Sequence, residues 1–314
     1  MSLKKSTIKF IEKKCKVNLN GKTVVITGAN SGIGFKTAET FVYCGSSVVM
    51  ACRNCEKAEE AKKKLLTDYP NAQIIVLQLD LADFASIENF VNEIKKRKID
   101  IDCFINNAGV FHQPNQKTKD GFELVMGTNF IGTFYLTELV YSYLLRFNHS
   151  ATLINTLSLV YKFPKLDYAD FYSQKKYKNF SVYSKSKLAL AKYTHYLANL
   201  QGYSADFRGV SNVKVYGVHP GISITPIANK AYPRLGKLAK GLRFLFNSTE
   251  KSSLAPLFIM ANNLPSGSVV GPKCLFSTRG FPRLNRISKK MKQGCVELVE
   301  FARKEIEKVN KARF

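Results

Sequence analysis

Two residues near the middle of the chain, Tyr183 and Lys187, have the types and the spacing of a proton-transfer pair. The apolar periodicity over residues 189–200 predicts a helix here, and residues four apart lie on one face of a helix. A free tyrosine has a pKa of about 10, which a nearby cation lowers by favouring the phenolate. We therefore expect Lys187 to lower the pKa of Tyr183, so that the phenol can exchange a proton. The alternative is a half-buried tyrosine beside a solvated lysine.

A glycine-rich turn near the N-terminus has the pattern of a phosphate-binding loop. The apolar strand 23–26 leads into Thr27-Gly28-Ala29-Asn30-Ser31-Gly32-Ile33-Gly34, and a helix to about residue 43 follows. Gly28 permits a tight turn, Gly32 lets a pyrophosphate approach the backbone, and Gly34 lets the helix pack on the strand. Because these glycines stand between a strand and a helix N-terminus, we favour dinucleotide binding over a purely structural turn.

Arg53 indicates which dinucleotide would bind. It follows Cys52 at the end of a second predicted strand over residues 47–51. In this kind of fold an acidic residue here accepts hydrogen bonds from a free ribose 2′-hydroxyl, whereas an arginine favours a 2′-phosphate. We therefore predict NADP(H) as the cofactor. A surface arginine without a ligand is the alternative.

Short apolar strands alternate with helices along most of the chain. Helices are expected over residues 55–69, 85–96 and 121–145, and strands over 73–79, 101–105, 151–157 and 213–218. This alternation predicts an α/β fold, a single doubly wound Rossmann-type parallel sheet with helices on both faces. Polar or glycine residues follow each strand, so they should gather at the carboxyl edge of the sheet, where such folds bind ligands.

Taken in order, the motifs resemble those of the short-chain dehydrogenase/reductase family over roughly residues 21–276. They are Thr27-Gly28-x-x-x-Gly32-Ile33-Gly34, Asp80-Leu81, Asn106-Asn107-Ala108-Gly109, Asn129, Ser158, Tyr183-x-x-x-Lys187 and Pro220-Gly221. Within the family the chain is most similar to the retinol dehydrogenase type. Residues 51–54, residues 106–123 and the step from Ser158 to Tyr183 carry that similarity.

The resemblance implies that a nicotinamide takes or supplies a hydride while an alcohol and an aldehyde or ketone interconvert. Ser158 would donate a hydrogen bond to the substrate oxygen, and Tyr183 would transfer its proton. Lys187 would hold the nicotinamide ribose, and Asn129 would position a water beside it. The implied cofactor contacts are Gly28, Asn30, Ser31, Gly32, Ile33, Gly34, Arg53, Asp80, Leu81, Asn107, Ala108, Gly109, Tyr183, Lys187, Pro220 and Gly221. A nucleophilic Ser158 is disfavoured, because no Gly-x-Ser-x-Gly motif surrounds it.

The chain departs from the family pattern at three places. Leu157 stands where many members have a first serine, and Ser31 stands where members that prefer NADP often have a basic residue. A basic polar leader replaces the apolar anchor of many membrane-bound retinol enzymes. The prediction of NADP(H) therefore depends on Arg53.

Two segments bear on the substrate. Aromatic residues between Ser158 and Tyr183 either line an apolar substrate site or pack this insert onto the body: Tyr161, Phe163, Tyr168, Phe171, Tyr172, Tyr177 and Phe180. Residues 235–246 have leucines at helical spacing with interleaved cations. We expect them to form a lid over the substrate, or to contact an anionic membrane surface together with the leader.

Charge and composition bound the organisation of the chain. The 314 residues carry 48 Lys and Arg against 23 Asp and Glu, a net charge of +25, which favours an anionic partner or serves solubility. We expect a basic leader over residues 1–20, one domain over 21–280 with a lid near 230–250, and a basic helical extension over 281–314, with a helix from about 286 to 311. No apolar run reaches the roughly 18 residues of a membrane span, and the leader lacks the apolar core of a signal peptide.

The seven cysteines are odd in number and irregular in spacing, as is typical of reduced thiols in the cytoplasm. We expect no metal site, a cytoplasmic location and, as an additional option, peripheral contact with an anionic membrane. No motif indicates specific nucleic-acid binding, and a homodimer is left open.

We therefore predict an NADP-dependent oxidoreductase acting on a small apolar alcohol or carbonyl compound, of retinoid, steroid or lipid-aldehyde type. The alternative is a regulatory protein that binds NADP without turnover. Such a protein would be expected to lose Tyr183 or Lys187, and this chain keeps both.

Overall fold

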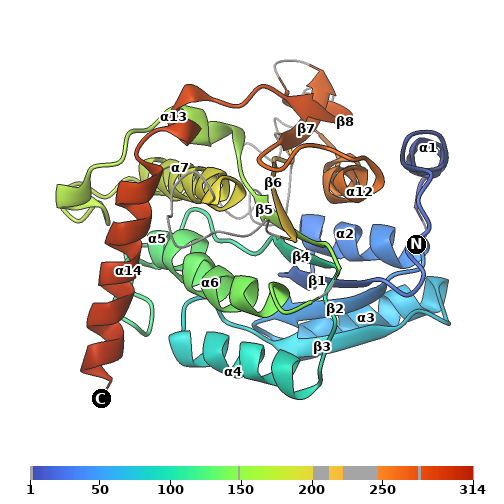
Figure 1. The fold of residues 1–314 in the computed structure, drawn as a ribbon, viewed down its shortest axis with the longest axis horizontal. Coiled ribbons are helices and arrows are strands. Elements are labelled where there is room, and N and C mark those ends of the chain that lie inside the picture. The colour runs from blue at the N-terminus through green and yellow to red at the C-terminus, as the bar shows by residue number, and fades with distance from the viewer. Residues whose placement is uncertain (1–2, 148, 201–211, 222–246, 275–276, 314) are drawn as a thin grey trace.

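The structure is a computed structural model that describes residues 3–147, 149–200, 212–221, 247–274 and 277–313 (Figure 1). The predicted lid near residues 230–250 falls largely outside the described residues, as does the whole of its amphipathic segment 235–246.

An eight-stranded sheet forms the centre of the molecule, with the strand order β3-β2-β1-β4-β5-β6-β7-β8. The strands are β1 (Thr23–Thr27), β2 (Ser47–Cys52), β3 (Ile74–Gln78), β4 (Cys103–Asn106), β5 (Ala151–Thr156), β6 (Val213–Val218), β7 (Val269–Cys274) and β8 (Arg279–Asn285). Neighbouring strands run parallel except β7 and β8, which are antiparallel. The doubly wound parallel sheet predicted from the sequence is confirmed, and β7 and β8 are additions that the sequence analysis missed.

Helices cover both faces of this sheet (Figure 1). Along the chain they are α1 (Lys5–Phe10), η1 (Ile11–Cys15), α2 (Gly32–Tyr43), α3 (Cys55–Asp68), α4 (Phe84–Lys96), α5 (Leu124–Met126), η2 (Gly127–Gly132), α6 (Thr133–Leu144), η3 (Leu159–Lys162), η4 (Tyr168–Asp170), α7 (Asn179–Ala198), α11 (Thr249–Ser252), α12 (Leu254–Ala261), α13 (Lys289–Lys292) and α14 (Cys295–Ala312). The predicted helices 55–69 and 85–96 correspond to α3 and α4.

Side chains alternate between two hydrophobic cores, one on each face of the sheet. In β1, Val25 belongs to a core formed with α4, α6, α7 and α14, whereas Val24 and Ile26 belong to a core formed with α2, α3 and α12. Successive residues of a strand point to opposite faces, so a sheet covered on both sides needs an apolar residue at nearly every position. The continuous apolar run at the start of the glycine motif therefore follows from its place in the middle of the sheet.

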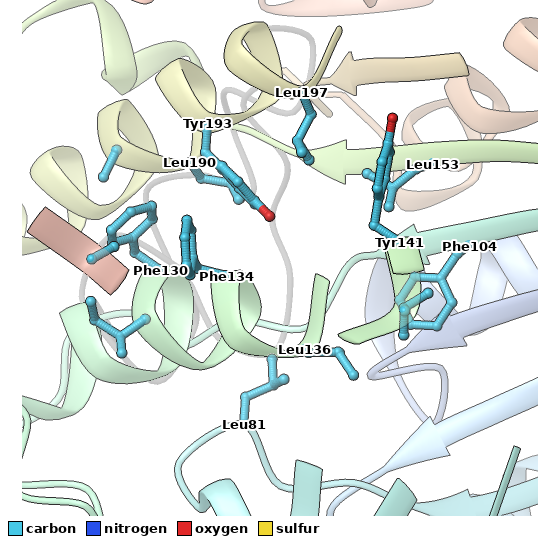
Figure 2. Packing of buried hydrophobic residues seen from close by; sticks show 14 of the residues in the cluster. Leu81, Phe104, Phe130, Phe134, Leu136, Tyr141, Leu153, Leu190, Tyr193 and Leu197 are labelled. Carbon is cyan, nitrogen blue, oxygen red and sulfur yellow. The ribbon is translucent and has the colours of Figure 1, made fainter. Parts of the chain in front are cut away.

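Aromatic residues of α6 and α7 fill the first core, as Figure 2 shows. The rings of Phe134 and Tyr193 lie 4.5 Å apart between their centroids, and both side chains are fully buried. The hydroxyl of Tyr193 donates to Glu138 at 2.6 Å, so the one polar atom of this ring has a partner. These contacts hold α7, which carries Tyr183 and Lys187, against the body of the domain.

The two ends of the chain pack onto this body. In the leader, Phe10 stacks on Phe281 of β8 with 4.6 Å between ring centroids, and the backbone N–H of Lys4 donates to Glu250 at 2.8 Å. The predicted C-terminal helix 286–311 is two helices, α13 and α14, and α14 packs on α7. Residue 280, the expected end of the main domain, lies within β8. Among the described residues, no helix is long and apolar enough to cross a membrane.

Replacing Phe134 with alanine tests the importance of the first core. Phe134→Ala removes a fully buried ring, so we expect the free energy of unfolding to fall by about 3–5 kcal/mol. Urea titration should show a lower midpoint with an unchanged slope. Phe163→Ala is the matched control, because the Phe163 side chain is 70% exposed. Equal losses in the two variants would contradict this account of the core.

Candidate active site

Tyr183 and Lys187 lie on the first half of α7, next to the carboxyl edge of the sheet. The Lys187 side chain is 5% exposed, and its ammonium donates a hydrogen bond to the backbone oxygen of Thr156, at the end of β5, at 2.9 Å. The same nitrogen lies 5.9 Å from the centroid of the Tyr183 ring. The ring of Phe111 lies against Tyr183, with 4.7 Å between centroids. The helical spacing predicted from the sequence thus brings the two side chains together.

Burial shifts the pKa of both Tyr183 and Lys187. Burial raises the pKa of Tyr183, and the neighbouring Ser158 hydroxyl lowers it by a smaller amount. Burial also lowers the pKa of Lys187 to about 8. Removal from water disfavours the charged form of either group. Burial therefore has the largest effect on the phenol, and a lowering of the Tyr183 pKa by Lys187 stays a prediction.

Ser158 follows β5 and precedes the short helix η3. Its backbone is extended, with φ of −145° and ψ of 151°, so it continues the alternation of the strand. Leu157 consequently points to the opposite side, where it is 1% exposed and packs close to Gly217 of β6. Leu157 thus belongs to the core, and Ser158 stays close enough to Tyr183 to lower the pKa of the phenol.

Asn129 lies in η2, a π-helical segment that interrupts the helix predicted over residues 121–145. The Asn129 side chain accepts from the Val110 N–H at 2.7 Å and donates to the Val110 carbonyl at 2.8 Å. It also donates to Ser186 Oγ on α7 at 3.2 Å. The amide therefore joins the segment after β4 to α7, beside Lys187. The sequence analysis missed Ser186 and Val110, because only the π-helical register brings them to Asn129.

The glycine turn connects β1 to α2. Gly28 and Gly32 have φ of +67° and +58°, which favour glycine. A Cβ at Gly34 would overlap the carbonyl of Gly28 and lie 2.5 Å from Asn107 Nδ2, so the helix start needs a glycine to approach the strand end. The side chain of Ser31 makes no capping hydrogen bond. The first N–H groups of α2 therefore have no side-chain cap, as a dinucleotide phosphate site requires.

A threonine holds this turn against β4. The hydroxyl of Thr27 accepts from the backbone N–H groups of Asn107 and Ala108, both at 2.9 Å, and Asn107 Nδ2 donates to the Thr27 carbonyl at 2.9 Å. Thr27 stood in the quoted motif but was absent from the predicted contacts. Gly109 continues this segment, and a Cβ there would lie 3.6 Å from Lys187 Nζ. The predicted residues 107–109 thus connect the glycine turn with the catalytic pair.

Arg53 lies beside the glycine turn. It is exposed directly after β2, and the thiol of the preceding Cys52 accepts hydrogen bonds from the N–H groups of Ala29 and Asn30. Arg53 makes no ion pair with any residue that the structure describes. A glycine turn, an uncapped helix start and a free guanidinium fit the phosphates of a dinucleotide, and the 2′-phosphate would meet Arg53.

The remaining predicted contacts lie at the ends of β3 and β6. Asp80 accepts from the Ala82 N–H at 3.0 Å, and Leu81 is buried, with its carbonyl oxygen next to Gly132 of η2. The carbonyl of Pro220 accepts from Asn247 Nδ2 at 3.0 Å and from Ser252 Oγ at 2.8 Å. All the predicted site residues are thus at the carboxyl edge of the sheet or on helices beside it. Asn247 and Ser252 are contacts that the sequence did not indicate.

A model of the short chain dehydrogenase family matches residues 22–235. This chain belongs to the short-chain dehydrogenase family. It is 39% identical to retinol dehydrogenase 14 of Mus musculus over 215 residues, which cover 65% of this chain and 62% of that protein. It is 38% identical to retinol dehydrogenase 12 of Mus musculus over 217 residues, which cover 69% and 66%. The chain thus matches less than two thirds of the length of these relatives, and its resemblance to the retinol dehydrogenase type is confirmed.

Solved structures have the same fold as this short-chain dehydrogenase. An uncharacterized protein from Mycobacterium paratuberculosis has a TM-score of 0.73 at 27% identity, covering 93% of this chain and 95% of its own. A short chain dehydrogenase from Shigella flexneri complexed with NADP has a TM-score of 0.62 at 21% identity, covering 82% and 98%. The second likeness, at low identity, concerns the fold alone.

His219 immediately precedes Pro220 and is 2% exposed. Its Nε2 lies 2.6 Å from Asn285 Nδ2 of β8. Burial, together with the positive charge of Lys162, lowers the pKa of His219 to about 4. The imidazole is therefore neutral in the folded protein at neutral pH, and it ties the end of β6 to the edge strand.

The pH dependence of stability tests this assignment. The unfolded chain has a histidine pKa of about 6.5, so between pH 6.5 and 4 it binds more protons at this position than the folded chain. Stability should fall as pH decreases through this window, by at most about 1.4 kcal/mol per pH unit from this residue. Denaturant titration at several pH values should show a shallower fall for His219→Gln.

His149→Gln provides a control of opposite sign. A hydrogen bond with Asp100 raises the pKa of His149, so this histidine stabilises the folded chain at low pH and loses that effect as pH rises. Removing His149 should lower stability by a constant amount below about pH 6.5, leave the slope between pH 6.5 and 4 unchanged, and change the slope only above pH 6.5. A His219→Gln profile parallel to wild type would refute the buried neutral imidazole.

Proposed function

We propose that this chain is an NADP(H)-dependent oxidoreductase that interconverts an alcohol and an aldehyde or ketone on an apolar substrate. The observation that carries the proposal is the buried ammonium of Lys187, which is fixed by the Thr156 carbonyl and lies 5.9 Å from the centroid of the Tyr183 ring. Membership of the family supports the class of reaction. The cofactor preference and the kind of substrate are inferred from this chain's own residues.

The bound nicotinamide would supply or accept the hydride. Ser158 lies close enough to Tyr183 to lower the pKa of the phenol, so the two hydroxyls could reach one substrate oxygen. In the reductive direction Ser158 would donate a hydrogen bond to the carbonyl oxygen, and Tyr183 would give that oxygen its proton. Burial raises the pKa of Tyr183, so the phenol is protonated at neutral pH and carries the proton that the substrate oxygen would receive.

Of the two residues Tyr183 and Lys187, Lys187 would contact the cofactor. Its ammonium is fixed by the Thr156 carbonyl and lies close to Gly109 in the predicted cofactor edge. Only one of the three protons of the ammonium is used by that hydrogen bond. The others could reach the ribose hydroxyls of a bound dinucleotide, as the family resemblance implies.

Arg53 supports NADP(H) over NAD(H). It is exposed beside the glycine turn, and no carboxylate among the described residues pairs with it. A guanidinium binds a phosphate through two parallel hydrogen bonds. Ser31 carries no charge, so the preference for NADP(H) would depend on the Arg53 side chain.

Aromatic contacts support an apolar substrate. Phe111 lies against Tyr183, next to the reacting hydroxyl. Of the aromatic residues in the insert, Phe171 and Tyr172 pack on Phe301 and Phe122, which favours the packing alternative for these two. Phe163 and Phe180 are 70% and 51% exposed. We infer that the site takes a retinoid, steroid or long aliphatic carbonyl compound, in line with the names of the relatives.

Peripheral contact with an anionic membrane, a cytoplasmic location and a homodimer stay predictions. The lysines of the leader, such as Lys5, Lys9 and Lys13, are exposed, which is compatible with peripheral contact with an anionic membrane.

Removing one hydroxyl tests the catalytic assignment. Tyr183→Phe should lower kcat for all-trans-retinal reduction or retinol oxidation by about 10²–10⁴-fold, because no other group can transfer the proton. NADPH affinity, measured by titration of the bound-cofactor fluorescence, should change little. Tyr43→Phe removes a hydroxyl on α2 and should behave as wild type. A Tyr183→Phe variant with wild-type kcat would exclude this role. A wild type that binds NADPH yet turns over no retinoid, steroid or aliphatic aldehyde would favour the regulatory alternative.

Replacing Arg53 tests the cofactor preference. We expect wild-type kcat/KM to favour NADPH over NADH by about ten- to a hundredfold, the size expected of one hydrogen bond to a charged group. Arg53→Ala should remove most of that preference by raising KM for NADPH, with KM for NADH unchanged. Arg283→Ala, on β8, removes the same charge elsewhere and should leave the ratio as it is. Equal wild-type kcat/KM for both cofactors would refute the assignment.

A further inference from the structure

A hollow of about 430 Å³ lies along the connection from β8 to α13. In Figure 1 this connection runs across the top of the view. Its volume falls within the range of small-molecule sites, about 300–1,000 Å³. β8 is the edge strand, and β1, which begins the glycine turn, is third from the opposite edge. The hollow is therefore separate from the predicted dinucleotide site.

Three cations line this hollow: Arg286, Lys289 and Lys292. Lys289 and Lys292 are three residues apart on α13, so they share one face of the helix. None of the three cations makes an ion pair with any residue in the described part of the chain. Among the described residues that line the hollow, there is no acidic side chain. Like charges gathered in one depression repel each other. An anion seated among them would relieve this repulsion.

Packing fixes where these cations stand. Met291 of α13 is fully buried. Lys290 turns away from the hollow, and its ammonium donates to the carbonyl oxygens of Phe163 and Pro164, at 2.6 and 3.0 Å. With the helix anchored by these two residues, Lys289 and Lys292 are left on the side of the hollow. Their arrangement is therefore set by the fold.

The electrostatic influence of this cluster reaches α7. Burial, and after it the positive charge of Lys292, lowers the pKa of His195. A histidine on a neighbouring helix thus experiences the positive potential of the cluster. Its titration offers a way to observe whether that potential is neutralised.

Apolar side chains complete the lining. Leu284 of β8 is 51% exposed, an unusual exposure for a leucine in a sheet, and Ile287 is partly buried beside it. The hollow thus has a cationic part and an apolar part next to each other. A ligand that fits both carries an anionic group on an apolar body.

We propose that this hollow binds a phosphate monoester with an apolar organic part. A phosphate monoester carries about −1.5 to −2 charges at pH 7 and three acceptor oxygens. The guanidinium of Arg286 can bind two of these oxygens in parallel, and the two ammonium groups balance the remaining charge. A carboxylate carries one charge and would leave the cluster less neutralised. The organic part lies over Leu284 and Ile287. The proposal does not depend on the proposed function.

Calorimetric titration at fixed ionic strength tests the cationic part, with inorganic phosphate and hexyl phosphate as probes. We expect both to bind wild type saturably. The double variant Lys289→Gln/Lys292→Gln should weaken the binding of each probe by about tenfold or more. Lys304→Gln/Lys311→Gln removes the same charge from exposed positions on α14 and should bind as wild type. Phosphate binding should also raise the pKa of His195, read from its NMR titration, in wild type only.

A substitution at Leu284 tests the apolar part. Hexyl phosphate should bind wild type about tenfold more tightly than inorganic phosphate, because its chain covers apolar surface. Leu284→Gln should remove that advantage and leave inorganic phosphate binding unchanged. Arg53→Ala should leave unchanged the part of the phosphate binding that Lys289→Gln/Lys292→Gln removes, because the dinucleotide site is elsewhere. Co-sedimentation with phosphatidic acid vesicles separates the sources: pelleting that the double lysine variant loses identifies a lipid headgroup, and binding of hexyl phosphate alone identifies a soluble ester.

Two results would overturn the proposal. One is the absence of saturable binding of either probe up to about 20 mM, which is too weak for a specific site. The other is undiminished binding by the double lysine variant, or its loss in Arg53→Ala, which would assign the phosphate to the dinucleotide site.

Discussion

The hydroxyl of Thr27 joins the two strand ends between which the site is built. It accepts from two consecutive N–H groups after β4, those of Asn107 and Ala108, while the Asn107 side chain returns a hydrogen bond to the Thr27 carbonyl. In the sheet order, β1 is flanked by β2 and β4, so the chain departs from it in opposite directions and leaves a crevice there. These hydrogen bonds fix the position of the segment after β4, which leads to Lys187, relative to the glycine turn.

Burial then decides the protonation of the groups in this crevice. The same loss of water lowers the pKa of Lys187 to about 8 and raises that of Tyr183, so at neutral pH the lysine is still mostly charged and the phenol keeps its proton. A raised pKa also makes the phenol a weaker acid, whereas an efficient proton donor has a pKa near the working pH. A cation close to the phenolate favours it, so the retained charge of Lys187 acts against the effect of burial on Tyr183.

The strands that could be predicted from the sequence are those whose central position in the sheet requires a continuous run of apolar residues. Strands at the centre are apolar at every position, and their carboxyl ends carry the motif residues, so β1, β2, β4, β5 and β6 were recognisable. β7 and β8 contain Gly271, Pro272 and Pro282, which are signals for turns. Prolines are tolerated in strands near the edge of a sheet, and only the tertiary pairing of Pro272 with Pro282 reveals that these are strands.

Side-chain partners were predicted less well than positions. The spacing of Tyr183 and Lys187 placed them together, but the sign of the effect on Tyr183 depends on how deeply the fold buries both, which spacing does not specify. The partners of Asn129 likewise depend on a π-helical turn, because an ordinary α-helix over residues 121–145 would orient that amide differently.

The position of β8 at the edge of the sheet also explains why the basic C-terminal segment lies apart from the glycine turn. β8 runs antiparallel to β7, so the chain leaves it at the amino end of β7, beside Val269. Because Val269 pairs with Gly217 near the carboxyl end of β6, this exit is level with the carboxyl ends of the central strands. The four strands between β1 and β8 separate Arg286 and the lysines of α13 from the glycine turn. The contact of Asn285 with His219 fixes that exit against β6. Burial, and after it the positive charge of Lys162, disfavours protonation of this imidazole, so the contact with Asn285 is made by an uncharged ring at neutral pH.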